Sequence, residues 1–363
     1  MQRRPGAGQR RPIIWRWASG AIALNQQASI ISADPVIEDF EDAAEEASEV
    51  ELRAWTIGTE QHGLRLDRAL SALVPEFSRS YLQQLIEAGA VTQGALTLRK
   101  PAHKVRAGER GQIELRPTPQ SQAFLPEAMA LDIVHEDEHL LVLNKPAGLV
   151  VHPAPGNWRG TLLNGLLAHD AKAAQLPRAG IVHRLDKDTS GLMVVARTRT
   201  TMDALVKLIA AREVSRQYLA LAHQPWSGPA RREVEGAIGR DPRNRLRMAV
   251  VDLLRQPGKP AKTTFELLYN AEQGCWLRCT LHTGRTHQIR VHAASIGHAL
   301  LADALYGGAP AAGMSRQALH AWRLAFTHPV SGRELVFKAD LPQDMREALA
   351  SWGVGYNAQQ DVL

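Results

Sequence analysis

The sequence is poor in three features that mark specialised classes of protein. It has 2 cysteines among 363 residues, which excludes a disulfide-stapled framework and favours a reducing, cytoplasmic compartment. No apolar run approaches the ~20 residues needed to cross a bilayer, so we predict no membrane association. Aromatic residues make up only 5% of the chain, yet 45% of it is hydrophobic. A chain of this length and composition buries sizeable cores, and we predict two domains.

Charges of one sign are missing from each part of the N-terminal region. Residues 1–33 hold five arginines and no acid, whereas residues 34–51 hold nine acids and no base. Blocks of like charge stay solvated, so we predict a flexible extension over residues 1–62. A signal peptide is disfavoured because Arg16 interrupts the apolar stretch 13–24. The whole chain has a net charge of +6 and a pI of about 9.5, which favours a polyanionic partner.

A compact module is predicted over residues 63–116. Apolar spacing and turn residues indicate two helices and then two strand-like segments, over residues 66–74, 79–88, 90–98 and 112–115. Pro75 stops the first helix and Ser78 caps the second. The module carries nine basic residues and five acids, hence a charge of +4. That charge favours contact with a polyanion.

This module resembles the S4 RNA-binding domain. The short runs that carry the resemblance are Arg65-Leu-Asp-Arg, Ser78-Arg-Ser, Ala90-Val and Arg99-Lys100-Pro101, with Gln93-Gly94 in place of the usual Asn-Gly. The resemblance implies that RNA phosphates are bound by basic side chains of the module, namely Arg65, Arg68, Arg79, Arg99 and Lys100. Three of these lie near the starts of the predicted helices, where backbone amides also attract phosphate.

Residues 180–197 are the most informative segment, Gly-Ile-Val-His-Arg-Leu-Asp-Lys-Asp-Thr-Ser-Gly-Leu-Met-Val-Val-Ala-Arg. Its two apolar runs, 181–182 and 192–196, are short and β-branched, and we predict strands. The polar turn between them ends at Gly191 and holds Asp186 rigidly yet within reach, as catalysis requires. The run His-Arg-Leu-Asp-x-x-Thr-Ser-Gly resembles the signature loop of the pseudouridine synthases of the RluA/RluD family.

Further segments match that family in the same order. They are Asn144-Lys145-Pro146, Val151-His152-Pro153, Thr161–His169, Arg216-Gln-Tyr218, Thr283–His292, Asp303–Gly308 and Arg316–Ala321. Ala302 is a departure, since a glycine is usual there. Within residues 131–153 we predict two strands around an acidic turn, a Lys-Pro-Ala-Gly loop and a third strand. Residues 161–169 resemble the short helix that the family places before its signature loop, so the resemblance implies a helix there.

The resemblance covers about residues 63–348 and implies an α+β architecture. After a linker over residues 117–125, the catalytic domain at 126–350 is expected to hold a mixed, mainly antiparallel sheet flanked by helices. Residues 351–363 are expected to form a C-terminal tail.

The resemblance also implies a reaction, the isomerisation of uridine to pseudouridine in RNA. The bond from C1′ to N1 breaks, the uracil turns, and C5 joins C1′, with no metal or cofactor. Asp186 acts either as nucleophile at C1′ or as base at C2′, and the sequence leaves both open. Arg290 lies beside this carboxylate, and Tyr218 packs on the uracil and assists loss of the C5 proton. Arg184 fills the space left by the flipped uridine, and His183 also contacts the RNA.

The target is suggested by three stretches, residues 180–191, 240–243 and 342–345, which are most similar to the RluD branch. That branch modifies a stem-loop of bacterial large-subunit (23S) ribosomal RNA. The related RluC branch also carries an S4 domain, so its sites remain an alternative. We expect a monomer whose partner is large-subunit ribosomal RNA or a pre-ribosomal particle.

Two other functions use the same residues. Asp186-Lys-Asp188-Thr-Ser loosely resembles the aspartate loop of haloacid-dehalogenase-type phosphatases. That loop usually follows an unbroken apolar strand, whereas His183 precedes it here, and no Gly-rich phosphate cradle is apparent. A ribosome-assembly factor whose catalysis is secondary is disfavoured by the intact set of Asp186, Tyr218 and Arg290.

A metal site is disfavoured on spacing. Cys275 and Cys279 stand four apart in a predicted strand, so they share one face and are expected in the core. His282, His287 and His292 stand five apart, which on a strand puts successive imidazoles on opposite faces.

Overall fold

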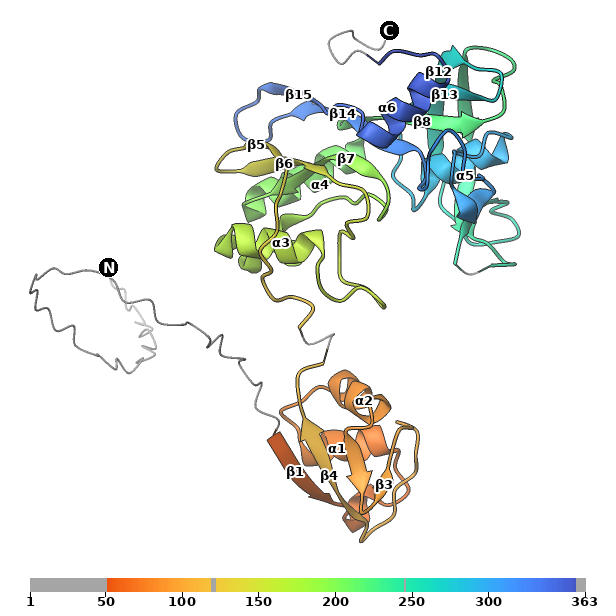
Figure 1. Ribbon diagram of the computed structural model, residues 1–363. Coiled ribbons are helices and arrows are strands. Elements are labelled where there is room, and N and C mark those ends of the chain that lie inside the picture. The colour runs from red at the N-terminus through yellow and green to blue at the C-terminus, as the bar shows by residue number, and fades with distance from the viewer. Residues whose placement is uncertain (1–50, 119–121, 245, 357–363) are drawn as a thin grey trace, which may run out of the picture. The chain divides into compact units, whose positions relative to one another are not determined.

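The computed structural model describes residues 51–118, 122–244 and 246–356. Residues 51–118 contain an N-terminal module, and residues 122–356 form a larger C-terminal unit (Figure 1). None of the helices in these ranges is both long enough and apolar enough to cross a membrane.

The N-terminal module combines a small sheet with two helices. Its strands are β1 (Glu51–Thr56), β2 (Val91–Gln93), β3 (Leu96–Thr97) and β4 (Arg110–Leu115), paired in the order β1-β4-β2-β3. A 3-10 turn, η1 (Thr59–Gln61), precedes the helices α1 (Leu66–Leu73) and α2 (Arg79–Glu87). The hydroxyl of Ser78 accepts a hydrogen bond from the amide of Tyr81 and so caps α2. The helices and strands predicted for residues 66–115 are confirmed.

The module begins earlier than the expected residue 63. Strand β1 pairs antiparallel with β4, and Trp55 and Ile57 are buried in the module core. The expectation of a flexible extension was therefore wrong for residues 51–62. The acidic residues next to β1 made this segment look like part of a solvated acidic block. Burial of the Trp55 side chain nevertheless stabilises a strand there. The remainder of the expected extension, residues 1–50, lies outside the described residues.

The C-terminal unit is built on a nine-stranded sheet. The strands are β5 (Ile133–Glu136), β6 (Leu140–Lys145), β7 (Ser190–Ala196), β8 (Ser215–His223), β9 (Arg231–Glu235), β12 (Lys262–Asn270), β13 (Gly274–Leu281), β14 (Leu319–Thr327) and β15 (Glu334–Lys338). Their order is β5-β6-β7-β14-β8-β13-β12-β9, with β15 beside β14. All pairs are antiparallel except β7–β14, which is parallel. The predicted mixed, mainly antiparallel sheet is confirmed.

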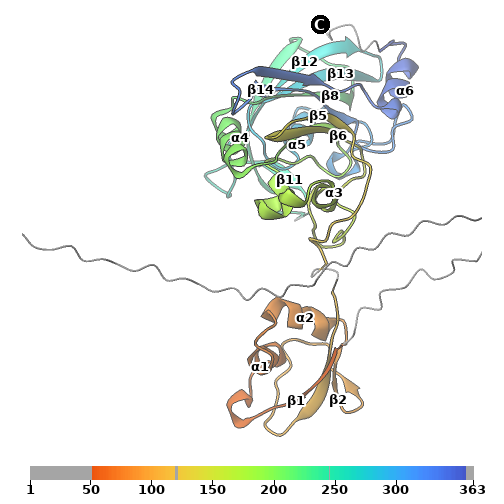
Figure 2. The ribbon, with the colours of Figure 1, turned by 90° about the vertical axis from the view of Figure 1, so that its left-hand side faces the viewer.

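Helices cover this sheet, and a separate hairpin lies beside it. The helices are α3 (Leu162–His169), α4 (Arg199–Ala211), α5 (Gln288–Ser295) and α6 (Gln343–Ser351), and the hairpin joins β10 (Ala237–Arg240) to β11 (Met248–Val251). Short 3-10 turns are η2 (Ala171–Gln175), η3 (Pro177–Gly180) and η4 (Ala304–Tyr306). In Figure 2, α4 and α6 lie to either side of the unit. Cys275 and Cys279 are buried in the core of β13, as predicted.

Two segments expected to be strands adopt other structures, and so does the segment with His287 and His292, for which the zinc argument used strand geometry. Ile181 makes only an isolated bridge to Val195. Residues 149–151 are irregular because the carbonyls of Val150 and Val151 accept hydrogen bonds from the first amides of α3. Residues 283–292 form a loop and the start of α5, with His287 at the helix N-cap.

Both expected boundaries of the C-terminal unit also shift. The side-chain amide of Asn164 donates to the carbonyls of Ala123 and Leu125, so the end of the expected linker is docked on α3. At the other end, Trp352 and Tyr356 pack on the apolar cluster beneath α6. The expected tail therefore contributes to the core as far as residue 356.

The parallel pair β7–β14 depends on Gly191. Its φ is +114°, and a Cβ there would lie 2.3 Å from the carbonyl oxygen of Ala321. Only glycine allows this approach. The loop at residues 180–191 is thus fixed at its C-terminal end to β14, a strand about 130 residues later in the chain.

Candidate active site

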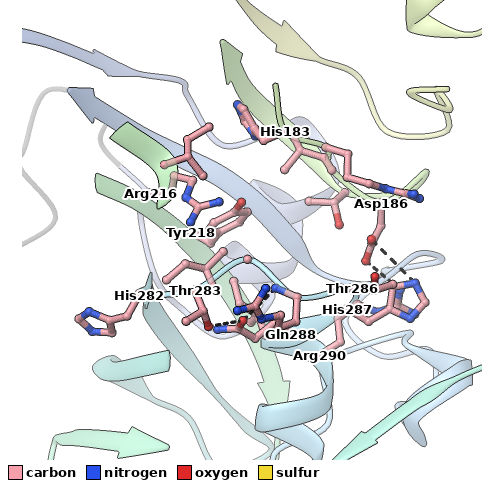
Figure 3. Close-up of a pocket in the computed structure, with 18 of the residues that line it drawn as sticks. His183, Asp186, Arg216, Tyr218, His282, Thr283, Thr286, His287, Gln288 and Arg290 are labelled. Atoms are coloured by element: carbon pink, nitrogen blue, oxygen red, sulfur yellow. Dashed lines mark hydrogen bonds and ion pairs between the residues drawn. The ribbon is translucent and has the colours of Figure 1, made fainter. Parts of the chain in front are cut away.

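A cavity of about 380 Å³ opens beside β8, one of the central strands of the sheet. Its walls come from the loop at residues 182–189, the end of α4, strand β8 and the segment 281–290. Figure 3 shows Asp186 on one side of this cavity and Tyr218 with Arg216 on another. The structure thus brings together three of the residues singled out in the sequence, Asp186, Tyr218 and Arg290.

Asp186 is held by Arg290 from the start of α5. Arg290 Nη1 donates to Asp186 Oδ2 at 3.0 Å. The other edge of the guanidinium binds Asp303, with Nε 2.7 Å from Oδ2 and Nη2 2.8 Å from Oδ1. Burial disfavours the charge of Arg290, but Asp303 and Asp186 outweigh burial and raise its pKa above the usual range. A permanently charged, doubly anchored arginine therefore fixes the Asp186 carboxylate.

A second group, His287, faces the other carboxylate oxygen. Its Nε2 lies 3.8 Å from Asp186 Oδ1, and its Nδ1 lies 2.8 Å from the hydroxyl of Tyr306. Burial lowers the pKa of His287, so the imidazole is neutral near pH 7. Tyr306 also packs its ring on the Arg290 guanidinium, 5.0 Å from ring centroid to Cζ.

The backbone that follows Asp186 is anchored by two cations, the buried Lys145 and the half-buried Arg316. Lys145 Nζ donates to three carbonyl oxygens, those of Pro146 (2.7 Å), Leu149 (2.9 Å) and Lys187 (2.9 Å). Burial lowers the pKa of Lys145 to about 8. Arg316 Nη1 donates to the carbonyl of Asp188 at 2.9 Å, and its other nitrogens bind Asp344 of α6. The loop therefore has little freedom to move Asp186.

Tyr218 lies on β8 and faces the cavity with 6% of its surface exposed. Burial raises the pKa of its phenol to about 12; the charge of Arg216 opposes this rise. The hydroxyl therefore stays protonated at neutral pH, and the ring offers a flat apolar face beside the carboxylate.

His183 and Arg184 line the same cavity but differ in their surroundings. His183 Nε2 accepts a hydrogen bond from the amide of Val194 at 3.1 Å, and burial lowers its pKa to about 3. This neutral imidazole ties the loop to β7. Arg184 is exposed at the rim.

The basic residues of the N-terminal module divide into two groups. Arg65 Nε and Arg79 Nη2 bind the buried carboxylate of Asp67 at 3.0 and 2.8 Å, and their bonds help to lower its pKa against the effect of burial. Arg68 and Lys100 are exposed on the module, as is Arg99, which donates to the carbonyl of Glu87.

The sequence did not assign roles to Asp303, Tyr306, His287 or Lys145. The spacing Asp303-x-x-Tyr306 places both groups on the single turn η4, and this spacing is the signal that was available. The buried Lys145 gave no such signal, since its partners are backbone carbonyls.

The three histidines considered for zinc bind different partners. His282 contacts Thr264, His287 contacts Tyr306, and His292 contacts Thr263 and the carbonyl of Gly236. Within the described residues no group of three or more histidine, cysteine or acidic side chains could hold a metal ion.

Comparison with known proteins places this geometry in a family. Residues 139–295 match the family model of the RNA pseudouridylate synthases. The ribosomal large subunit pseudouridine synthase D of Neisseria meningitidis serogroup B is 47% identical over 325 residues, which cover 86% of this chain and 84% of the relative. Enzymes of the same name from Nitrosomonas europaea (47% over 299 residues; 79% and 84%) and Escherichia coli O6:H1 (42% over 332 residues; 87% and 99%) are also similar. The chain belongs to the RluA/RluD family of RNA pseudouridine synthases.

Proposed function

We propose that this enzyme isomerises specific uridines of bacterial large-subunit (23S) ribosomal RNA to pseudouridine, at the stem-loop sites of the RluD type. The observation that carries the proposal is Asp186, fixed by Arg290 at 3.0 Å in a cavity that also holds Tyr218. The names of the similar proteins support the choice of RNA. The RluC-type sites on the same RNA are the alternative target.

The reaction begins at the glycosidic bond of the target uridine. Asp186 either attacks C1′ or removes the proton from C2′, and in both cases the bond from C1′ to N1 breaks. Arg290 keeps the carboxylate oriented, because the guanidinium is itself anchored on its far side by Asp303. Tyr218 stacks on the uracil while the base turns and C5 joins C1′. Its protonated hydroxyl lies where it can assist the later loss of the C5 proton through hydrogen bonding.

The target uridine must leave its helix to reach this cavity. Extruding a base costs a few kcal/mol. Arg184, exposed at the rim, is placed in our proposal to occupy the vacated space in the RNA. His183 holds the same loop against β7, because its imidazole accepts a hydrogen bond from the amide of Val194. In our proposal it contacts the RNA next to Arg184.

The N-terminal module supplies RNA affinity in this proposal, in the manner of an S4 domain. Its exposed cations Arg68, Arg99 and Lys100 are the foremost phosphate ligands, since Arg65 and Arg79 share Asp67. Replacing Arg68 or Lys100 by glutamine should weaken RNA binding and reduce the slope of log Kd against log salt by about 1 per lost contact. Turnover at saturating RNA should not change.

Mapping of pseudouridines in ribosomal RNA tests the function. Large-subunit RNA from cells that lack this protein should lose pseudouridine at a small set of positions. The wild-type gene should restore them and the Asp186→Asn gene should not. Loss at RluC-type positions would transfer the assignment to that branch, and an unchanged map would refute it.

A further inference from the structure

Arg216 is a buried cation in the wall of the active-site cavity. It lies on β8, two residues before Tyr218, and only 8% of its surface is exposed. Its Nε is buried with no hydrogen-bond partner. Among the residues that the structure describes, no carboxylate forms an ion pair with it. A buried charge in this state is costly, which indicates that a ligand completes the site.

The surroundings of Arg216 restrict where that ligand can lie. A Cβ on Gly284 would lie 2.9 Å from Arg216 Nη1, so the backbone of the segment 283–285 covers the guanidinium closely. The charge of Arg216 opposes the rise that burial causes in the pKa of Tyr218, and it adds to the fall that burial causes in the pKa of His183, so its field reaches both of these cavity residues. The space left to a ligand is the cavity itself, beside the ring of Tyr218 (Figure 3).

The buried position of Arg216 indicates which part of the RNA it binds, the target base or the backbone. Asp186 must meet the ribose, and Figure 3 shows Tyr218 and Arg216 on the opposite side of the cavity from Asp186. We infer that a base attached to that ribose extends toward them. The exposed Arg184 and Arg212 at the cavity rim are better placed for phosphates, which stay hydrated. We therefore infer that Arg216 binds the base.

We propose that Arg216 is a catalytic residue that stabilises the uracil anion formed when the glycosidic bond breaks. The electron pair of the C1′–N1 bond remains on the uracil, and the negative charge spreads from N1 onto O2 and O4. The guanidinium donates to a keto oxygen of this anion while the base turns. C5 then bonds to C1′, the C5 proton leaves, and N1 takes up a proton, so no co-reactant is needed. This inference rests on the proposed function.

The test measures single-turnover rates on a stem-loop RNA with enzyme in excess. Arg216→Gln should lower the rate about 100-fold, as expected for loss of one fixed donor to a developing anion, with little change in the Kd for RNA. Arg216→Lys should recover part of the rate. Gly284→Ala, which displaces the guanidinium without removing its charge, should show a smaller loss. Arg199→Gln, an exposed arginine paired with Asp203, is the matched control and should behave as wild type.

Two altered RNAs separate the base from the backbone. With 5-fluorouridine as the target the uracil anion is more stable. The rate at which the C1′–N1 bond breaks should therefore differ less between Arg216→Gln and wild type than it does with uridine. Methylphosphonates beside the target should weaken binding equally for wild type and Arg216→Gln. A variant with a wild-type rate, or one that loses affinity and is insensitive to methylphosphonate, would overturn the proposal. A wild-type enzyme inactive on every ribosomal stem-loop would instead refute the proposed function.

Discussion

Asp303 binds Arg290 through both of its carboxylate oxygens, at 2.7 and 2.8 Å, on the side of the guanidinium that faces away from Asp186. The catalytic carboxylate is thus held by a cation that is itself held by a second, almost fully buried carboxylate. Asp303 therefore helps to position Asp186 without touching it, through Arg290.

Replacing Asp303 by asparagine should show how much the site depends on this anchor of Arg290. The variant removes one charge of a buried pair and leaves Arg290 without that partner, so we expect a loss of about 3 kcal/mol in the free energy of unfolding together with a reduced single-turnover rate. Denaturant unfolding and rapid-quench kinetics measure the two effects. Asp203→Asn, at an exposed pair, is the control and should change neither. An Asp303→Asn rate equal to wild type would show that Arg290 needs no anchor.

Within the loop, the two aspartates should respond differently. Asp186→Asn should fold normally and lose essentially all isomerase activity, since an amide neither attacks C1′ nor accepts a proton. Asp188→Asn should keep most activity, because the described contact of that residue with Arg316 uses its backbone carbonyl. Similar losses in both variants would contradict the assignment of Asp186. Pseudouridine formation and circular dichroism check the two variants.

The two cavity arginines Arg184 and Arg290 should act on different partners. Arg184→Ala should slow the reaction more on a structured stem-loop than on a short unstructured RNA, whose base costs less to extrude. Arg290→Ala should slow both RNAs severely, because it removes the partner of Asp186. Single-turnover rates on the two RNAs decide this, and equal losses on both for Arg184→Ala would exclude its role in flipping.

Lys145 should give the protein a pH dependence near pH 8. Burial lowers its pKa from 10.5 to about 8, so between these values the unfolded chain binds a proton that the folded chain lacks. The cost of burying the ammonium is complete below pH 8, and relative stability rises as pH increases through this window. The free energy of unfolding of wild type minus that of Lys145→Met should therefore rise with pH. The rate should fall above pH 8, since a neutral amine donates fewer hydrogen bonds to the loop.

A Lys145→Met difference that stays constant from pH 7.5 to 10 would refute this assignment. Chemical denaturation at several pH values supplies the measurement.

Ala302 offers a stabilising substitution. Its φ is +56°, in the left-handed region where alanine is strained. Ala302→Gly should raise the free energy of unfolding by about 0.5 to 1 kcal/mol. Ala304→Gly, at a position where φ is not positive, should lower it and serves as the control. Thermal unfolding distinguishes the two.

Local chemistry explains which features could be predicted from the sequence. Periodicity and caps located α1 and α2, the family resemblance located α3, and the signature run identified Asp186. None of these needed knowledge of distant contacts. The prediction failed where contacts with distant parts of the chain determine the local structure or the role of a residue. Residues 149–151 bind the start of α3 instead of a strand, β1 forms because β4 covers it, and Asp303 is recognised only once Arg290 lies beside it.

The parallel pairing of Gly191 with Ala321 has a consequence for the synthesis of the enzyme. Asp186 lies near the middle of the chain, but the arginine that orients it is 104 residues later, and the strand that closes its loop comes later still. Contacts between residues this far apart in the sequence form slowly, because a long loop must close first. A nascent chain that ends before residue 290 would carry the signature loop and Tyr218 without the arginine that positions the carboxylate. Isomerase activity should therefore appear only when the last third of the chain has been made.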